Sequence, residues 1–258
     1  MSLLQVEKLT KNFGGLAAVS MVDFKLESNE LVGLIGPNGA GKTTLFNLLT
    51  GVYVPTSGEI VMEIDGKKER LNGVKPYVIT KKGLARTFQN IRLFKELTVL
   101  DNVLIAMHQN SKAGVLASIF RLPKYYRSEE GMRQEALSLL SIFDLDNKQQ
   151  ELAKNLPYGD QRCLEIVRAL ATKPKILFLD EPAAGMNPQE TADLTKQIRK
   201  IQQDFKITVV LIEHDMSLVM DICERIYVLE YGRMIAHGTP GEIKQNPKVI
   251  KAYLGGEE

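Results

Sequence analysis

The sequence predicts an α/β fold in which a mainly helical segment is inserted into the sheet-forming part of the chain. Three observations support this prediction. Residues 30–35, 176–179 and 207–212 are nearly continuous apolar runs, which are typical of strands buried on both faces of a sheet. Segments with helical periodicity follow the first two runs, as expected for a parallel sheet. Residues 91–159 carry mainly helical patterns, which predicts a separate helical lobe.

Further strands are expected near both ends of the chain. Residues 3–30 and 59–65 contain alternating apolar and polar side chains, a pattern typical of strands with one buried face. Two short strands are expected at 225–229 and 233–236, around a Tyr-Gly turn. The charged run 66–70 is interpreted as a solvated connection of the hairpin type.

Helices are predicted from their caps and from helical spacing of apolar residues. One is expected over 99–109 and another from about 160 to 172. Asn187 followed by proline begins a third, and a capping box at Thr239 begins a C-terminal helix. Residues 111–128 allow two interpretations, a short helix packed in the core or an exposed contact for a partner, of which the core is favoured.

Composition excludes several classes of protein. The chain has 258 residues, and its 33 basic and 31 acidic residues give a net charge of +2, so a strongly basic nucleic-acid surface is not expected. Cys163 and Cys223 lie in apolar helical patterns and are expected to be reduced. Neither a signal peptide nor an apolar run of about 18 residues is found. We therefore expect a soluble, cytoplasmic protein that reaches a membrane only through a partner.

A glycine-rich loop lies between the first buried strand and a predicted helix. We call it the phosphate loop, and it consists of Gly36, Pro37, Asn38, Gly39, Ala40, Gly41, Lys42, Thr43 and Thr44. It fits the pattern G-x-x-x-x-G-K-[ST] at every fixed position. Glycines let successive backbone N–H groups approach a phosphate, and the following helix directs its positive end toward the anion. Lys42 is expected to reach the β- and γ-phosphates, and the Thr43 hydroxyl to bind Mg²⁺.

Polar residues follow the other two buried strands. Asp180 and Glu181 end the run at 176–179, and His214 follows the run at 207–212. Open α/β sheets bind ligands at the carboxyl ends of their strands, so these side chains are expected beside the phosphate loop. Two adjacent carboxylates there are best explained as a metal ligand and a general base. Phe13 could stack on a nucleotide base or simply pack, and the spacing does not decide between the two.

These clusters occur in a fixed order that resembles the ATP-binding cassette ATPases across essentially the whole chain. The order is the phosphate loop, Gln89, the segment 156–161, and then Asp180–Glu181 with His214. The resemblance implies an α/β P-loop NTPase core with a mixed sheet, an antiparallel β subdomain and an inserted α-helical subdomain. The implied divisions are 1–90 and 160–240 for the nucleotide-binding core, 91–159 for the helical subdomain that ends in the signature motif, and 241–258 for a C-terminal helix and tail.

The resemblance also implies a role for individual residues. Asp180 corresponds to the residue that holds Mg²⁺ through water, and Glu181 to the general base. His214 corresponds to the switch histidine at the γ-phosphate of ATP. Gln89 matches the glutamine that touches Mg²⁺ and water and links the two lobes. Phe13 matches the aromatic residue that stacks on adenine.

The segment 156–161 matches the family signature, which faces the ATP of a second cassette. The residues implied in that contact are Tyr158, Gly159, Asp160 and Gln161. The sequence departs from the family pattern at two positions. Pro157 stands where the signature usually has a serine, and Asn187 stands where the segment after Asp180–Glu181 usually has an aspartate. Both put the full activity of that composite site in question.

Several short segments resemble those of the branched-chain amino acid importer ATPases of bacteria. They include Arg86-Thr87-Phe88-Gln89 and Ala252-Tyr253-Leu254-Gly255. The resemblance implies integral-membrane permease subunits, a second ABC ATPase in a hetero- or homodimer, and a periplasmic substrate-binding protein as an indirect partner. It places the protein on the inner face of the cell membrane and implies no nucleic-acid partner.

Urea and amide importers and the lipopolysaccharide export ATPase remain alternatives to the branched-chain amino acid importer. A soluble cassette protein acting on DNA or ribosomes, and a small-molecule kinase, are less favoured.

Overall fold

The structure is a computed structural model that describes residues 2–108 and 123–254. Most of the segment 111–128, for which two interpretations were open, lies outside the described residues. The chain divides into two compact units. One comprises Met1–Arg86, Lys175–Pro182 and Ile198–Glu258, and the other comprises Thr87–Pro174 and Ala183–Gln197. The domain boundaries inferred from the resemblance stay a prediction.

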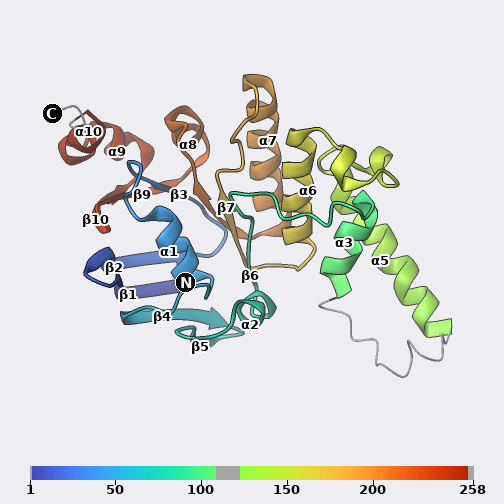
Figure 1. Ribbon diagram of the computed structural model, residues 1–258, viewed down its shortest axis with the longest axis horizontal. Coiled ribbons are helices and arrows are strands. Elements are labelled where there is room, and N and C mark those ends of the chain that lie inside the picture. Colours follow the sequence, from blue (N-terminus) through green and yellow to red (C-terminus); the bar gives the residue numbers. More distant parts are fainter. Residues whose placement is uncertain (1, 109–122, 255–258) are drawn as a thin grey trace. The chain divides into compact units, whose positions relative to one another are not determined.

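The first unit contains a six-stranded mixed sheet in the order β10-β9-β3-β8-β7-β6. Figure 1 labels β10, β9, β3, β7 and β6 of this sheet. Its strands are β3 (Leu31–Ile35), β6 (Leu84–Arg86), β7 (Ile176–Asp180), β8 (Thr208–Ile212), β9 (Arg225–Glu230) and β10 (Arg233–Gly238). Neighbouring strands are parallel except β9 and β10, which are antiparallel. Every residue of β3, β7 and β8 is buried. The α/β fold with a mixed sheet is therefore confirmed.

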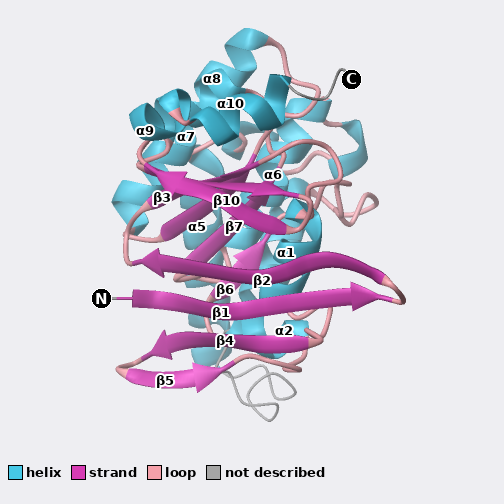
Figure 2. Cartoon of the chain, turned by 90° about the vertical axis from the view of Figure 1, so that its left-hand side faces the viewer, coloured by secondary structure: helices cyan, strands magenta, loops and turns pink. Residues whose placement is uncertain are grey.

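A second, antiparallel sheet in the same unit has the order β2-β1-β4-β5. Figure 2 shows these four strands side by side. They are β1 (Ser2–Phe13), β2 (Leu16–Glu27), β4 (Ser57–Ile64) and β5 (Lys67–Arg70). The interpretation of 66–70 as a connection was wrong, because Lys67–Arg70 pairs with β4 as an edge strand. An edge strand that faces water tolerates charge on both faces, so it lacks the alternation that marks other strands.

Helix α1 (Lys42–Leu49) lies in the hydrophobic core that joins both sheets. The core residues of α1 are Leu45, Phe46, Leu48 and Leu49. The Phe46 ring meets the Phe178 ring of β7 edge to face, with 4.8 Å between centroids. Because α1 begins at the last part of the phosphate loop, this packing fixes the loop relative to the mixed sheet.

The other helices of this unit are α2 (Pro76–Lys81), α8 (Met216–Ile222), α9 (Pro240–Gln245) and α10 (Pro247–Leu254). The predicted capping box is present, since the Thr239 side chain and the Glu242 side chain each accept from the other's backbone N–H. The single C-terminal helix that was expected is two helices. A second proline begins α10, because proline fits the first turn of a helix but interrupts its interior.

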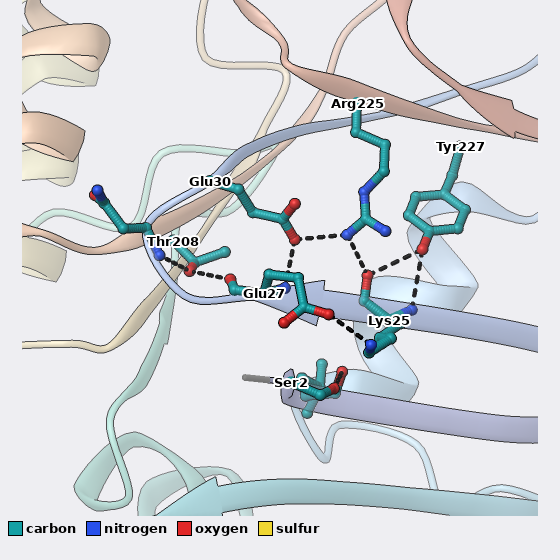
Figure 3. Close-up of polar contacts among 9 residues, drawn as sticks. Ser2, Lys25, Glu27, Glu30, Thr208, Arg225 and Tyr227 are labelled. Carbon is teal, nitrogen blue, oxygen red and sulfur yellow. Dashed lines mark hydrogen bonds and ion pairs between the residues drawn. The ribbon is translucent and has the colours of Figure 1, made fainter.

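A polar network joins the antiparallel sheet to the amino ends of the parallel strands (Figure 3). Glu30 Oε1 accepts hydrogen bonds from Arg225 Nη2 at 2.6 Å and from Glu27 N at 2.5 Å. The Thr208 hydroxyl donates to the Glu27 carbonyl oxygen at 2.7 Å. Arg225 also donates to the Lys25 carbonyl oxygen at 2.8 Å. The network stabilises the end of the sheet opposite to the carboxyl ends of β3, β7 and β8.

The second unit is helical. Its described helices are α3 (Val99–His108), α5 (Pro123–Ser141), α6 (Tyr158–Leu170) and the first part of α7 (Pro188–Phe205), and its described part also contains the 3₁₀ turns Asp146–Lys148 and Ala153–Asn155. The helix predicted at 99–109 is confirmed over its described residues, Val99–His108. Among the described residues, no helix is long and apolar enough to cross a membrane. Both cysteines are free, and burial raises each thiol pKa to about 12.

Candidate functional site

The candidate site lies where three neighbouring parallel strands end. β3, β8 and β7 are adjacent in the mixed sheet, so their carboxyl ends lie along one edge. β3 leads into the phosphate loop, β7 ends at Asp180 before Glu181, and β8 precedes His214 by two residues. The first unit therefore brings the phosphate loop and these three side chains to the same edge.

The phosphate loop depends on glycine at two positions. Gly36 has a φ of +152° and Gly41 a φ of +100°, values that other residues rarely adopt. A Cβ at Gly36 would lie 2.0 Å from the Leu229 carbonyl oxygen, and one at Gly41 would lie 2.5 Å from the Ala18 carbonyl oxygen. The loop backbone thus packs closely against β9 and β2. Its N–H groups and the first turn of α1 form the kind of concave site that holds a phosphate.

Lys42 is a buried cation at the start of α1. Its side chain is 6% exposed, and Nζ donates to the carbonyl oxygens of Gly36 at 2.6 Å and Pro37 at 3.0 Å. Burial lowers the Lys42 pKa, whereas the negative charges of Glu181 and Asp180 act to raise it. The ammonium group is therefore held between the loop carbonyls and the two carboxylates, within reach of an anion on the loop.

Asp180 lies in a buried ion pair that links three elements. Its Oδ2 atom is 3.2 Å from Nη2 of Arg86, and the two side chains are 1% and 9% exposed. Arg86 ends β6, and its Nη1 atom donates to Asn47 Oδ1 at 2.6 Å and Thr50 Oγ1 at 3.1 Å. The guanidinium group thus connects the end of β7 to α1, the helix that follows the phosphate loop.

Replacing Arg86 with glutamine is expected to lower the free energy of unfolding by about 3–5 kcal/mol, because breaking one side of a buried ion pair leaves a poorly compensated charge. Urea unfolding monitored by circular dichroism measures this loss. Lys196→Gln is the matched control, since Lys196 pairs with Asp193 on the surface, with side chains 74% and 50% exposed. That surface pair is expected to contribute about 0–1 kcal/mol. Equal losses in both variants would contradict the assigned importance of the buried pair.

Glu181 and His214 form a close pair at the same edge. Glu181 Oε1 is 2.9 Å from His214 Nε2, and the side chains are 15% and 47% exposed. Glu181 has a φ of +50°, and its N–H donates to the Ile212 carbonyl oxygen at 2.9 Å. The left-handed turn ends β7 and directs the chain away from the sheet. A partly solvated carboxylate beside an imidazole is a suitable arrangement for accepting a proton from water.

Phe13 belongs to a small exposed aromatic group in the same unit. Its ring is 43% exposed and meets the Tyr53 ring edge to face, with 5.3 Å between centroids. Lys11 Nζ lies 5.1 Å from the Phe13 centroid. Tyr53 was not singled out from the sequence. An exposed ring at this position is available to a planar ligand, although packing against Tyr53 also occurs.

The other predicted residues belong to the helical unit. Tyr158, Gly159, Asp160 and Gln161 form the first turn of α6, and Asp160 is paired with Lys148. Arg162, 3% exposed, donates to the carbonyl oxygens of Phe88 at 2.8 Å and Gln89 at 2.5 Å. Within this unit, α6 therefore holds the backbone of the segment that contains Gln89.

The donor atoms at the strand ends suit magnesium bound together with a phosphate compound. Among residues 2–108 and 123–254, no group of three or more His, Cys, Asp and Glu side chains is arranged to hold a metal ion. Asp180 offers a carboxylate and Thr43 an exposed hydroxyl. Mg²⁺ usually takes one or two carboxylates and completes its octahedron with phosphates and waters. The residues present therefore fit Mg²⁺ that arrives with a nucleotide.

Sequence reasoning assigned no role to Arg86 or Arg162. A signal for Arg86 was available, because an arginine at the carboxyl end of a strand beside β7 can reach the residue that ends β7. No comparable signal exists for Arg162, whose partners are backbone carbonyls more than 70 residues away in the sequence.

The fold and site define a phosphate-loop nucleotide-binding protein of the α/β class. The family model described as "ABC transporter" matches residues 19–184, and the model described as "Branched-chain amino acid ATP-binding cassette transporter" matches residues 233–258. The chain therefore belongs to the ABC transporter family of ATP-binding proteins. It is an ATP-hydrolysing transport ATPase.

Relatives and solved structures agree with this assignment. The high-affinity branched-chain amino acid transport ATP-binding protein BraF of Pseudomonas aeruginosa is 49% identical over 253 residues, which are 98% of each chain. LivG of Escherichia coli (strain K12), described by the same activity, is 47% identical over 98% of each chain. The crystal structure of the ADP conformation of MJ1267, an ATP-binding cassette of an ABC transporter, matches with a TM-score of 0.83, 30% identity and 99% of each chain covered.

Proposed function

We propose that this chain hydrolyses ATP to drive the import of branched-chain amino acids. The observation that carries the ATPase part is the single edge of the mixed sheet that holds the phosphate loop, Lys42, Asp180 and the Glu181–His214 pair. Branched-chain amino acids are proposed as the cargo because the relatives named for their transport are 49% and 47% identical in sequence over 98% of this chain. It is also supported by the match of the branched-chain family model to residues 233–258.

The phosphate loop is proposed to bind the phosphates of ATP. Its backbone N–H groups and the amino end of α1 supply donors, and Lys42 supplies the positive charge nearest to the terminal phosphates. Phe13 is proposed to stack on adenine at the exposed aromatic group, with Lys11 adding a cation near the ring. The nucleotide then lies with its terminal phosphate toward Asp180 and Glu181.

Thr43, Asp180 and Gln89 are proposed to hold Mg²⁺, with Asp180 acting through water. Bound in this position, the ion neutralises charge that develops on the phosphate oxygens. Asp180 is well suited to a fixed role, because the ion pair with Arg86 restricts its side chain. Gln89 belongs to the helical unit, so its approach to the ion remains part of the proposal.

Hydrolysis is assigned to Glu181 and His214. Glu181 accepts a proton from a water molecule as the water oxygen forms a bond to the γ-phosphorus. The bond between the γ-phosphorus and the bridging oxygen breaks, and ADP leaves with its electron pair. His214, 2.9 Å from Glu181, is proposed to orient the carboxylate and contact the γ-phosphate. The positions of both groups at the strand ends support these roles.

A complete site is proposed to need two cassettes. Tyr158, Gly159, Asp160 and Gln161, at the amino end of α6, would contact the ATP held by the second cassette. Pro157 lies at the cap position of α6 and makes no side-chain hydrogen bond there. Each composite site to which this chain contributes its signature segment is therefore expected to lack a hydroxyl contact to the γ-phosphate.

The partners follow from the same proposal. Integral-membrane permease subunits place the chain on the inner face of the cell membrane, and a second ABC ATPase completes the pair. A periplasmic substrate-binding protein acts indirectly through the permeases, and no nucleic acid is involved. The segment 89–94 is proposed to meet a permease. The predicted division assigns hydrolysis to the nucleotide-binding core and most of the segment 89–94 to the helical subdomain.

The cargo alternatives are urea or amides, and lipopolysaccharide in an exporter. Purification of the tagged chain from native membranes after mild crosslinking, followed by mass spectrometry, tests among them. We expect two different permeases and a second short cassette. Recovery of lipid-export components would contradict the amino-acid cargo, and recovery of ribosomal or DNA-repair proteins alone would contradict transport. Glu59→Gln, an exposed change on β4, is the control variant and is expected to recover the same partners.

A further inference from the structure

Three charged side chains on successive turns of α6 contact the segment 88–94. They are Arg162, Glu165 and Arg168, and we call them the α6 ladder. Arg162 and Glu165 are 3% and 5% exposed, and Nη1 of Arg162 lies 3.6 Å from Oε2 of Glu165. Charged side chains are rarely buried this deeply unless they have specific partners. The ladder and the segment belong to the same helical unit.

Arg162 contacts the segment and the first turn of α6 at the same time. Its guanidinium group donates to the carbonyl oxygens of Phe88 at 2.8 Å and Gln89 at 2.5 Å. Its Nε atom donates to the Tyr158 hydroxyl at 3.2 Å, and the guanidinium group lies 5.4 Å from the centroid of the Tyr158 ring. Residues 158–161, which we call the signature turn, are proposed to face the ATP of the second cassette. One buried guanidinium group therefore links the signature turn to the segment.

Glu165 and Arg168 hold the later part of the segment. Glu165 Oε1 accepts a hydrogen bond from the Arg92 backbone N–H at 3.2 Å, and Arg168 donates to the Arg92 carbonyl oxygen. The Arg168 guanidinium group also lies 5.0 Å from the centroid of the Phe94 ring. Both backbone groups of Arg92 are thus bound by side chains of α6. The Phe94 ring is still 46% exposed, so the segment keeps an apolar group available to a partner.

The ladder makes a relative movement of α6 and the segment 88–94 unfavourable. Sliding either element would leave buried donors and acceptors without partners, and a buried polar group that loses its hydrogen bond is destabilising. Hydrogen bonds that involve a charged group are also the stronger ones. The two elements are joined in this way although more than 70 residues separate them in the sequence. We therefore expect them to move as one body within the helical unit.

We infer that Arg162 and Glu165 are positioning residues that couple the signature turn to the permease. Closure of the second cassette on ATP displaces the amino end of α6, and the ladder carries the segment 88–94 with it. This inference rests on the proposed roles of the signature turn and of the segment 89–94. Neither residue is assigned a contact with nucleotide or cargo. Loss of the ladder is therefore expected to separate ATP hydrolysis from transport.

The amount of leucine transported per ATP hydrolysed tests the inference. The complex purified through this chain is placed in phospholipid vesicles with its periplasmic binding protein, and leucine uptake and phosphate release are measured in parallel. Arg162→Gln is expected to lower the ratio of leucine to ATP by about 2- to 30-fold, the range typical of weakened coupling between sites. Partial unfolding lowers uptake and hydrolysis together, so a merely structural role leaves the ratio unchanged.

Arg133→Gln makes the same chemical change in the same unit and is the matched control. Nη2 of Arg133, on α5, donates to Gln149 Oε1 at 3.0 Å. Its loss leaves the ladder complete, and the wild-type ratio is expected. Arg162→Lys keeps the positive charge but lacks the planar fork that reaches two carbonyl oxygens and a hydroxyl, so its ratio is expected to stay low. A folded Arg162→Lys chain that loses its permeases during purification likewise indicates lost coupling.

Amide hydrogen exchange of the full chain tests whether the ladder holds the segment. Exchange at residues 88–94 is expected to be faster in Arg162→Gln than in the wild type or Arg133→Gln. Unchanged exchange, or an unchanged ratio of leucine to ATP in folded Arg162→Gln, would overturn the inference while leaving the transport assignment intact. Wild-type vesicles that hydrolyse ATP without taking up leucine would instead contradict the proposed function itself.

Discussion

Replacing Glu181 with glutamine is expected to slow ATP hydrolysis by about 10²- to 10⁴-fold, the usual contribution of a general base. Glutamine has nearly the same shape but cannot take a proton from water. ATP binding is expected to persist, because Lys42 and the phosphate loop are unchanged. Steady-state phosphate release and equilibrium binding of a fluorescent ATP analogue measure the two effects separately.

The same chemical change at an exposed position is the control. Glu59 lies on β4, and its carboxylate is 3.3 Å from Arg70 Nε on the surface. Glu59→Gln is expected to hydrolyse ATP at the wild-type rate. If Glu181→Gln retained near-normal turnover, the general base would be another group, and the close pair with His214 would have only a structural role.

Replacing Lys42 with alanine is expected to weaken ATP binding by on the order of 10²- to 10³-fold, as found when one partner of a buried charge pair is removed. The side chain is 6% exposed, so the phosphates would lose a desolvated cation. Asp180 and Glu181, whose charges favour the ammonium form, would also repel the nucleotide more strongly. Isothermal titration with ATP measures the loss.

Folding must be checked alongside binding, because Lys42 also donates to two loop carbonyls. Thermal unfolding of Lys42→Ala reports whether the variant is intact at the temperature of the titration. Lys196→Ala, at an exposed position of α7, is expected to bind as the wild type does. Tight ATP binding by a folded Lys42→Ala chain would contradict the assignment of the phosphate loop.

The edge that carries the site could be predicted because its strands are buried on both faces. Continuous apolar runs end abruptly in polar residues at Asp180 and before His214, and parallel strands share one carboxyl edge. The glycine loop adds a local pattern that needs no tertiary information. Sequence alone therefore located the loop, the carboxylates and the imidazole on neighbouring elements.

Elements without such patterns were harder to predict. The strand β5 is made of four charged residues, and only its pairing with β4 identifies it. Pro123 begins α5. Pro247 likewise begins α10. A proline marks a helix boundary in the sequence, but its position does not say whether the helix ends or begins there.

Contacts between distant residues could not be predicted from spacing. Arg86 and Asp180 meet because β6 and β7 are neighbours, and Arg162 reaches the carbonyl oxygens of Phe88 and Gln89 across more than 70 residues of sequence. Such partners depend on the three-dimensional path of the chain. They also carry ordinary residue types, so no local motif distinguishes them.

Uptake of radiolabelled leucine tests the central claim most directly. A strain that lacks this chain is complemented with the wild-type gene, with Glu181→Gln or with the Glu59→Gln control. We expect the wild type and Glu59→Gln to restore uptake, and Glu181→Gln to fail although it reaches the membrane in equal amount. Equal leucine uptake with and without the chain, in a strain with no second leucine importer, would contradict the assignment to branched-chain amino acid import.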